Sequence, residues 1–336
     1  MIGQKMDRSA RPPCDSKKVK KLLQTQAIKS KKHVTDINIS KKAKQVTENK
    51  QETKQTKENE GQPIHGYRIL EKMGSGGTSV VFKAENIDSG DIVALKLLFP
   101  NLNQDKEILK QFISEGLILQ RLQHSNILQG IDFGVSNGMY FLALELVHGE
   151  SLDLFLQQGL SFTEKYTFEV ALQISEALAY LQEKKMIHRD VKPANILLLS
   201  DGSVKLCDFA YAMETSFQKK KSKNDNLTCG TVEYISPEQA RGRMDLDIRS
   251  DIYSLGITCI HMLSGKVPFM NDDPREVMRQ QIYEKIELKK IVTISKMGRL
   301  LLKRMIAKKR ENRFYADRLV HMLKKVLALP SKNLEN

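Results

Sequence analysis

Short apolar runs and a longer helical spacing follow one another along this chain and predict different elements. Tyr67 to Leu70 and Val93 to Leu95 are brief runs of β type, and Phe141 to Leu146 is typical of a buried strand. Between them, apolar residues recur with helical spacing at Ile108, Phe112, Leu119 and Leu122. Further on, Ile252 to Leu263 is an apolar stretch long enough for a central helix. The pattern therefore predicts strands with one helix first, and helices later.

The first 61 residues lack this apolar patterning. They are rich in Lys, Gln, Thr, Ser and Asn, and their sixteen basic and seven acidic residues carry most of the chain's net charge of +14. We expect residues 1–61 to be a disordered basic extension. Val19, Leu22, Leu23 and Ile28 give residues 17–32 a weak amphipathic pattern. The extension is either a solvated tether or a segment for an acidic partner, a membrane surface or nucleic acid.

Residues 188–195, His-Arg-Asp-Val-Lys-Pro-Ala-Asn, carry the most specific chemistry. Asp190 can accept the proton of an attacking hydroxyl, and Asn195 can ligate magnesium at the same phosphates. Asp208, thirteen residues after Asn195, supplies a carboxylate for the principal magnesium ion. Together these residues resemble the catalytic loop and metal-binding triplet of the eukaryotic-like protein kinases. Ala210 stands where that triplet usually ends in glycine, which narrows the backbone freedom after Phe209.

Upstream motifs agree with this resemblance. A run that is similar to a glycine-rich phosphate loop consists of Met73, Gly74, Ser75, Gly76 and Gly77, although such a run alone is more often a plain turn. One strand later, Lys96 is the candidate clamp for the α- and β-phosphates. We expect Glu115, rather than the competing Glu107, to pair with Lys96 from the predicted helix.

The resemblance also implies an adenine site at the hinge between two lobes. The backbone of Glu145 and Val147 would read the adenine edge, with Leu144 at the gatekeeper position. The apolar surfaces above and below the ring would be supplied by Val81, Ala94 and Leu197. Simple core packing explains these apolar side chains equally well.

Residues 229–239 resemble the end of a kinase activation segment, which forms the floor for the acceptor residue. A bridge between Lys192 and Thr231 is the pattern of serine/threonine kinases. Glu238 is expected to pair with a buried arginine, and Arg313 is the match. Asp251 is expected to hold backbone amides of the catalytic loop, or to cap a helix.

The resemblance covers residues 67–327, and within it the chain resembles the bacterial serine/threonine kinases in particular. It implies an α+β, bilobal fold, with a small β-rich lobe carrying one main helix and a larger helical lobe. We expect a kinase domain over residues 62–328, divided into lobes at 62–147 and 148–328, and a C-terminal tail at 329–336.

Four cysteines without metal-type or disulfide-type spacing predict a reducing, cytoplasmic compartment. No apolar stretch is long enough to span a bilayer, and lysines interrupt the N-terminus before a signal peptide can form. Signal input is therefore expected from soluble partners or from the extension.

Arg189, next to the base, suggests control by phosphorylation, because a buried cation there needs an anion. The candidate sites are Thr215, Ser216, Ser222 and Thr228, of which Ser222 and Thr228 are favoured. The lysine-rich stretch at residues 219–223 is a solvated loop or a site for an acidic substrate.

The function that the resemblance implies is transfer of the γ-phosphoryl group of ATP to Ser and Thr of proteins, with autophosphorylation. In this interpretation Asp190 is the base, Lys192 steadies the phosphoryl group, and Asn195 and Asp208 hold Mg²⁺, with Mn²⁺ as a substitute. One alternative is a catalytically weak pseudokinase scaffold, and another is a small-molecule kinase of related fold. The scaffold is disfavoured because every chemical residue is present, and the small-molecule kinase because of residues 229–239.

Overall fold

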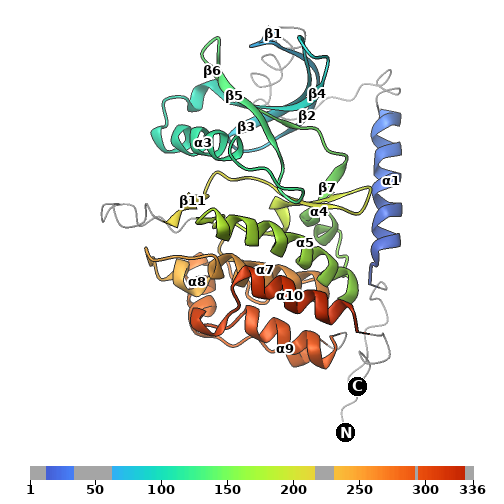
Figure 1. The fold of residues 1–336 in the computed structure, drawn as a ribbon, viewed down its shortest axis with the longest axis vertical. Coiled ribbons are helices and arrows are strands. Elements are labelled where there is room, and N and C mark those ends of the chain that lie inside the picture. The colour runs from blue at the N-terminus through green and yellow to red at the C-terminus, as the bar shows by residue number, and fades with distance from the viewer. Residues whose placement is uncertain (1–12, 34–62, 216–230, 292–293, 330–336) are drawn as a thin grey trace. The chain divides into compact units, whose positions relative to one another are not determined.

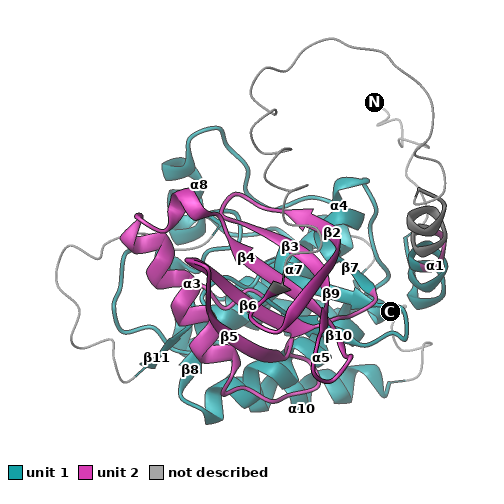
Figure 2. Cartoon of the chain, turned by 90° about the horizontal axis from the view of Figure 1, so that it is seen from above, with its two compact units in different colours: residues 1–23, 149–207, 211–336 teal, residues 24–148, 208–210 magenta. Residues whose placement is uncertain are grey.

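The computed structural model describes residues 13–33, 63–215, 231–291 and 294–329, with the side chains of residues 26–33 and 63 outside the description. The chain divides into two compact units (Figure 2). The β-rich unit comprises residues 24–148 and 208–210. The helical unit comprises residues 1–23, 149–207 and 211–336. The α+β class that the sequence predicts is confirmed.

The β-rich unit is built on an antiparallel sheet in the order β1-β2-β3-β4-β6-β5 (Figure 1). Its strands are β1 (Pro63–Ile64), β2 (Tyr67–Ser75), β3 (Ser79–Asn86), β4 (Ile92–Leu98), β5 (Gly130–Ser136) and β6 (Met139–Glu145). Between β4 and β5 lie the short 3₁₀ helix η1 (Pro100–Leu102) and helix α3 (Lys106–Leu119). Helix α3 begins where the Asp105 carboxylate accepts hydrogen bonds from the backbone amides of Glu107 and Ile108.

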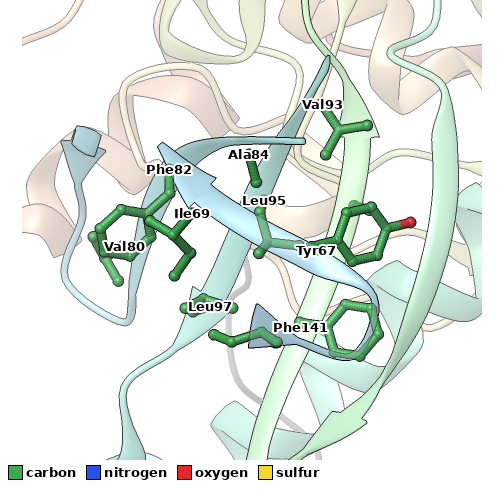
Figure 3. Packing of buried hydrophobic residues seen from close by; sticks show 11 residues of the cluster. Tyr67, Ile69, Val80, Phe82, Ala84, Val93, Leu95, Leu97 and Phe141 are labelled. Atoms are coloured by element: carbon green, nitrogen blue, oxygen red, sulfur yellow. The ribbon is translucent and has the colours of Figure 1, made fainter. Parts of the chain in front are cut away.

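The strand register places the buried apolar cluster on one face of this sheet and Lys96 on the other. Phe82 pairs with Leu95, which pairs with Ala143, and all three belong to one buried cluster (Figure 3). The next positions along the strands point to the opposite face, because side chains alternate in a strand. Lys96 is one of them, paired with Val81 on one side. The apolar core thus fixes which face presents Lys96.

The helical unit contains most of the remaining helices: α4 (Leu152–Gln157), α5 (Glu164–Glu183), α6 (Pro237–Ala240), α7 (Arg249–Ser264), α8 (Pro274–Tyr283), α9 (Lys296–Met305) and α10 (Ala316–Leu327), with short 3₁₀ turns η2 (Pro193–Asn195), η4 (Leu288–Lys290) and η5 (Arg310–Asn312). Two small antiparallel sheets accompany them, one formed by β7 (Gly149–Ser151), β9 (Ile196–Leu199) and β10 (Val204–Leu206), and one by β8 (Met186–Ile187) and β11 (Met213–Glu214). Helix α7 is the predicted central helix and is followed by Gly265, whose φ of 70° suits a residue without a Cβ atom. Among the described residues, no helix combines the length and the apolarity needed to cross a bilayer.

The N-terminal extension differs from the expected disorder over part of its length. Helix α1 spans Ser16–His33, inside the range 1–61 that we expected to be disordered. The prediction of disorder is therefore wrong for this helix, whose weak amphipathic pattern at residues 17–32 the polar composition outweighed. The other residues of the extension, apart from 13–15, lie outside the described residues.

The start of α1 is docked on the helical unit, to which residues up to Leu23 belong. Cys14 forms a parallel bridge with Phe162, in which its amide donates to the Ser161 carbonyl at 2.7 Å. Val19 and Leu23 are both buried, one turn apart. Lys20 Nζ donates to the Asp201 carbonyl at 2.9 Å. Two of the apolar positions that suggested a partner-binding helix, Val19 and Leu23, are thus used within the chain itself.

We expect Val19→Asp to undock this segment, because a carboxylate cannot be buried there without a partner. The loss of one buried aliphatic side chain predicts a drop of about 1.5–3 kcal/mol in the free energy of unfolding. Urea denaturation of the full chain measures it. The matched control is Gln24→Asp, which places the same charge at an exposed position of the helix. Equal stability of the two variants would contradict the docking.

Candidate active site

Lys96 and Glu115 form a close ion pair within the β-rich unit. Lys96 Nζ lies 2.9 Å from Oε1 and 2.7 Å from Oε2 of Glu115. The Glu115 carboxylate is almost fully buried, whereas the Lys96 side chain remains 18% exposed. Glu107, the competing carboxylate, lies in the first turn of α3. The structure therefore selects Glu115, as the sequence predicted, and presents an oriented ammonium group on the sheet face opposite the apolar core.

Two small apolar residues, Val81 and Ala94, lie on the same sheet face as Lys96. Val81 pairs directly with Lys96, and Ala94, two residues before Lys96, pairs with Leu144 of β6. Val81 and Ala94 are only half-buried. This face therefore combines a charged group with small apolar surfaces, as a nucleotide site does. Leu197 lies half-buried in β9 of the helical unit.

The predicted glycine-rich loop is the hairpin between β2 and β3. The Gly76 amide donates to the Ser79 carbonyl at 2.8 Å and closes the turn. A Cβ atom on Gly74 or Gly77 would meet nothing within 4 Å, and neither glycine has a positive φ. Packing and backbone conformation within the chain therefore do not explain these glycines. Close approach of an outside group to the backbone does, which fits a triphosphate.

Strand β6 leads into the predicted adenine-reading segment. The Glu145 side chain accepts a hydrogen bond from the Gln129 amide at 2.8 Å, and the Glu145 amide donates to the Gln129 carbonyl at 3.0 Å. These two bonds fix the backbone of Glu145 and thereby the start of the segment that carries Val147. Both residues belong to the β-rich unit.

In the helical unit, Asp251 bonds the backbone of residues 188–195, the candidate catalytic loop. This carboxylate lies in the first turn of α7, is fully buried, and accepts bonds from the backbone amides of His188 and Arg189, each at 2.8 Å. Burial raises the pKa of Asp251, and the neighbouring His188 and the two amides oppose that rise. Arg189 adopts a left-handed backbone with φ of 71°. Strained backbone of this kind persists only where its surroundings hold it, and Asp251 does so here.

The ring of His188 adds a second anchor to the loop. The Asp190 amide donates to Nδ1 of His188 at 3.3 Å, and Nε2 lies 3.1 Å from the Cys207 carbonyl. Because Nδ1 accepts a hydrogen bond, the ring proton of neutral His188 belongs on Nε2, where it donates to that carbonyl. The ring therefore connects the backbone of Asp190 to the strand end that precedes Asp208.

Asp190 is the centre of a buried cluster of hydrogen-bond donors. Its Oδ2 lies 2.8 Å from Lys192 Nζ and 3.0 Å from Asn195 Nδ2, and its Oδ1 accepts from the Thr231 amide at 3.2 Å. Lys192 Nζ also donates to the Thr231 hydroxyl at 2.7 Å, which is the predicted bridge. The cluster brings a proton acceptor, an ammonium group and an amide ligand within a few ångströms of one another. Such an arrangement suits phosphoryl transfer to a hydroxyl.

Asp208 belongs to the β-rich unit together with Phe209 and Ala210. Its backbone is left-handed, with φ of 62°, and its Oδ1 accepts from the Ala210 amide at 3.4 Å. Within the described part of the chain, no group of three or more His, Cys, Asp or Glu residues is arranged to hold a metal ion. The Asp208 carboxylate is the kind of oxygen ligand that Mg²⁺ uses, because Mg²⁺ binds through few protein groups and completes its shell with phosphates and water.

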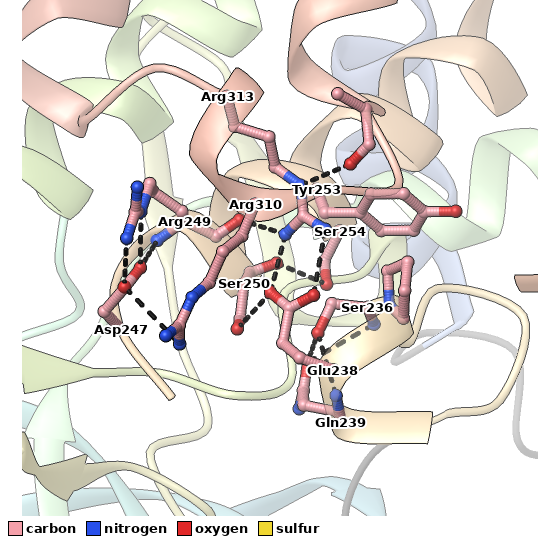
Figure 4. A network of polar contacts seen from close by, with 12 residues as sticks. Ser236, Glu238, Gln239, Asp247, Arg249, Ser250, Tyr253, Ser254, Arg310 and Arg313 are labelled. Carbon is pink, nitrogen blue, oxygen red and sulfur yellow. Dashed lines mark hydrogen bonds and ion pairs between the residues drawn. The ribbon is translucent and has the colours of Figure 1, made fainter. Parts of the chain in front are cut away.

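A buried ion pair anchors the end of residues 229–239, the stretch that resembles the end of an activation segment, as predicted. Glu238 Oε1 and Oε2 lie 2.6 and 2.9 Å from the two terminal nitrogens of Arg313, and both side chains are buried (Figure 4). The Ser250 hydroxyl donates to the same carboxylate at 2.7 Å. Burial alone would raise the pKa of Glu238, but the bonds and charge of Arg313 lower it below its usual value.

The sequence did not single out two glutamines that the structure shows to be important. Gln239 completes a capping box with Ser236 and donates from Nε2 to the Arg189 carbonyl at 2.9 Å. The Ser-x-x-Gln spacing signals the cap, but nothing in the sequence signals the bond to Arg189. The other is Gln281 of α8, which is fully buried.

Of the four predicted phosphorylation sites, one lies in the part of the chain that the structure describes. Ser216, Ser222 and Thr228, with the lysine-rich stretch 219–223, lie outside the described residues. Thr215 is described, and its hydroxyl donates to the Lys185 carbonyl at 3.1 Å. Arg189 Nη1 lies 3.3 Å from the Met213 sulfur, and its buried Nε has no hydrogen-bond partner among the described residues.

Comparison with known proteins gives consistent similarities. Residues 67–323 match the family model described as protein kinase domain. A probable serine/threonine-protein kinase of Clostridium acetobutylicum is 32% identical over 252 residues, which cover 74% of this chain and 38% of that protein. The serine/threonine-protein kinase PrkC of Bacillus subtilis is 35% identical over 210 residues, which cover 62% of this chain and 32% of PrkC. Aurora kinase A-A of Xenopus laevis is 31% identical over 243 residues, which cover 72% of this chain and 58% of that kinase. The chain spans about a third of the length of the two bacterial relatives.

Proposed function

Since this chain belongs to the protein kinase family, we propose that it transfers the γ-phosphoryl group of ATP to serine and threonine hydroxyls of proteins. The observation that carries the proposal is the cluster around Asp190. There, Lys192 bonds both the candidate base and the Thr231 hydroxyl. That bridge ties the base to the segment that resembles an acceptor floor.

In the proposed reaction, Asp190 accepts the proton of the acceptor hydroxyl as the hydroxyl oxygen bonds to the γ-phosphorus. The bond from that phosphorus to the β-γ bridging oxygen breaks, and ADP leaves with the electron pair. Lys192 stabilises the charge on the phosphoryl group in transfer. Asn195 and Asp208 would hold Mg²⁺, or Mn²⁺ in its place. The metal, when bound, neutralises the charge that develops on the phosphate oxygens.

The β-rich unit would hold the nucleotide. Lys96, oriented by Glu115, would contact the α- and β-phosphates. The backbone of the loop formed by Met73, Gly74, Ser75, Gly76 and Gly77 would donate amide hydrogens to the triphosphate. Glu145 and Val147 would read the adenine edge through their backbone groups. The ring would contact the apolar side chains of Val81, Ala94 and Leu197.

The pseudokinase alternative lacks support in the site. The lysine, its carboxylate partner, the base and both metal ligands are all present, and Asp190 and Lys96 each have the partner that catalysis requires. A scaffold would have no need to retain this buried polar cluster, which costs free energy to bury. We accordingly propose an active enzyme that also phosphorylates its own activation segment.

The partners we propose are proteins with Ser or Thr acceptors, in a cytoplasmic setting. A phosphate on the segment that follows Asp208 would supply a partner for the Arg189 Nε, which has none within the described residues. The residues of the extension outside the described range retain the earlier alternatives, a tether or a segment for an acidic partner, a membrane surface or nucleic acid.

The acceptor class is tested by incubating the chain with labelled ATP, Mg²⁺ and casein. We expect phosphoserine and phosphothreonine in the acid hydrolysate and no phosphotyrosine, and we expect EDTA to abolish transfer. Phosphotyrosine as the main product, or transfer to water alone, would contradict the proposed acceptor class.

A further inference from the structure

The acceptor segment, residues 231–240, is anchored at both ends by bonds already described. At its start, the Thr231 amide donates to Asp190 and its hydroxyl accepts from Lys192. Near its end, Glu238 pairs with Arg313. Between these anchors, the Tyr234 amide donates to the Thr231 carbonyl at 3.0 Å, which forms a tight turn. The two residues inside this turn, Val232 and Glu233, need their own support if the turn is to stay in place.

Gln281 provides that support from helix α8. Its Nε2 donates to the Glu233 carbonyl at 2.6 Å and lies 3.5 Å from the Val232 carbonyl. Its side chain is fully buried. A buried amide that lost these partners would leave unpaired polar groups on both sides, which is unfavourable away from water.

The orientation of the Gln281 amide is itself fixed by two further residues. The Tyr253 hydroxyl donates to Oε1 of Gln281 at 2.7 Å. Lys308 Nζ donates to that same hydroxyl at 2.9 Å and to the Gln281 carbonyl at 2.6 Å. The Lys308 ammonium group can only donate hydrogen bonds, so the Tyr253 hydroxyl accepts from Lys308 and donates its own proton to Oε1 of Gln281. With Oε1 held in this way, the amide protons of Gln281 point to the turn. The Arg313 guanidinium lies over the Tyr253 ring at 4.8 Å, next to the Glu238 anchor.

We propose that Gln281 is a positioning residue for the protein acceptor, acting through the turn at residues 231–234. This inference rests on the proposed function and identifies what holds the turn at residues 231–234 in position relative to Asp190. A shift of the Glu233 carbonyl moves Thr231, and with it the amide that bonds Asp190. Gln281 touches neither ATP nor the reacting atoms in this proposal, so it affects the acceptor more than the nucleotide.

The test is Gln281→Met in the full chain, which keeps length and burial but removes both amide groups. With casein as acceptor, we expect the KM for casein to rise about tenfold while the KM for ATP stays within twofold. Gln280→Met is the matched control at the next position, because the Gln280 side-chain oxygen has no hydrogen-bond partner among the described residues. An unchanged KM for casein in Gln281→Met would overturn the proposal, as would an equal rise in both KM values.

A second variant and a second measurement separate this inference from the proposed function. Tyr253→Phe keeps the ring and removes only the hydroxyl that orients Gln281, so we expect a smaller rise in the KM for casein, about threefold. Hydrogen exchange followed by mass spectrometry needs no activity at all. It should show at least tenfold faster exchange of the Tyr234 amide in Gln281→Met than in Gln280→Met. Equal exchange would overturn the positioning role, even in an active enzyme. Faster exchange in a chain that transfers no phosphate would uphold the support of the turn by Gln281 and overturn its role toward an acceptor, together with the proposed function.

Discussion

Asp190→Asn lowers the kcat of phosphoryl transfer by a factor of about 10²–10⁴, the contribution expected of a positioned general base. Asparagine preserves the size of the side chain but cannot accept the proton of the acceptor hydroxyl. The contacts of Lys96 with Glu115 lie in the other unit and are left as they are. The KM for ATP is therefore expected to stay within about threefold. Initial rates with labelled ATP and casein measure both quantities.

Asp201→Asn is the matched control for this variant. Asp201 lies in the exposed turn after β9, where its carboxylate accepts bonds from Ser203. The same substitution there should leave kcat within twofold of the wild-type value. A similar loss of kcat in both variants, or no loss in Asp190→Asn, would remove Asp190 from the role of base.

The largest expected effect on stability belongs to Arg313→Met. Removal of the guanidinium leaves the Glu238 carboxylate buried without its partner, and breaking a buried pair in this way costs about 3–5 kcal/mol. Methionine fills part of the volume, so the loss is mainly electrostatic. Urea denaturation at pH 7 measures the change in the free energy of unfolding.

The pH dependence of this loss distinguishes the ion pair from simple packing. The pKa of Glu238 is lowered in the folded chain, so the pair adds stability above the ordinary value of 4.5. That stability disappears as pH falls through the folded pKa, because protonation removes the charge. The difference between wild type and Arg313→Met should therefore shrink in acid. Arg279→Met, which breaks an exposed pair with Glu276, should change the stability far less than Arg313→Met does at pH 7, because solvent screens that pair. A loss that does not change with pH would indicate packing instead.

The sequence predicted those parts of the site in which a residue type and its spacing are required by chemistry. The pairing of Lys96 with Glu115 follows from a strand, a loop and two helical turns, and the structure confirms it. The Lys192 bridge to Thr231 and the Glu238 pair with Arg313 are confirmed in the same way. In each case both partners are charged or polar, and the order of the motifs along the chain limited which residues could pair.

The parts that the sequence did not predict depend on packing between distant segments. Helix α1 was missed because a few apolar residues among many lysines are enough to dock a helix on an existing surface, although they cannot fold alone. Gln281 was missed because its partners stand 28 and 48 residues away, and a single glutamine in an amphipathic helix carries no motif. Tertiary contacts of this kind become visible only when the helices are in place.

The most direct test of the central claim is incorporation of labelled phosphate from ATP and Mg²⁺ by the wild-type chain, Asp190→Asn and Lys96→Ala, with mapping of the modified residues by mass spectrometry. We predict that the wild type labels Ser and Thr, on casein and on its own activation segment, and that both substitutions lower the labelling at least about a hundredfold. A folded wild-type chain that binds ATP and transfers no phosphate would contradict the account, as would labelling of Asp190→Asn at a rate close to that of the wild type.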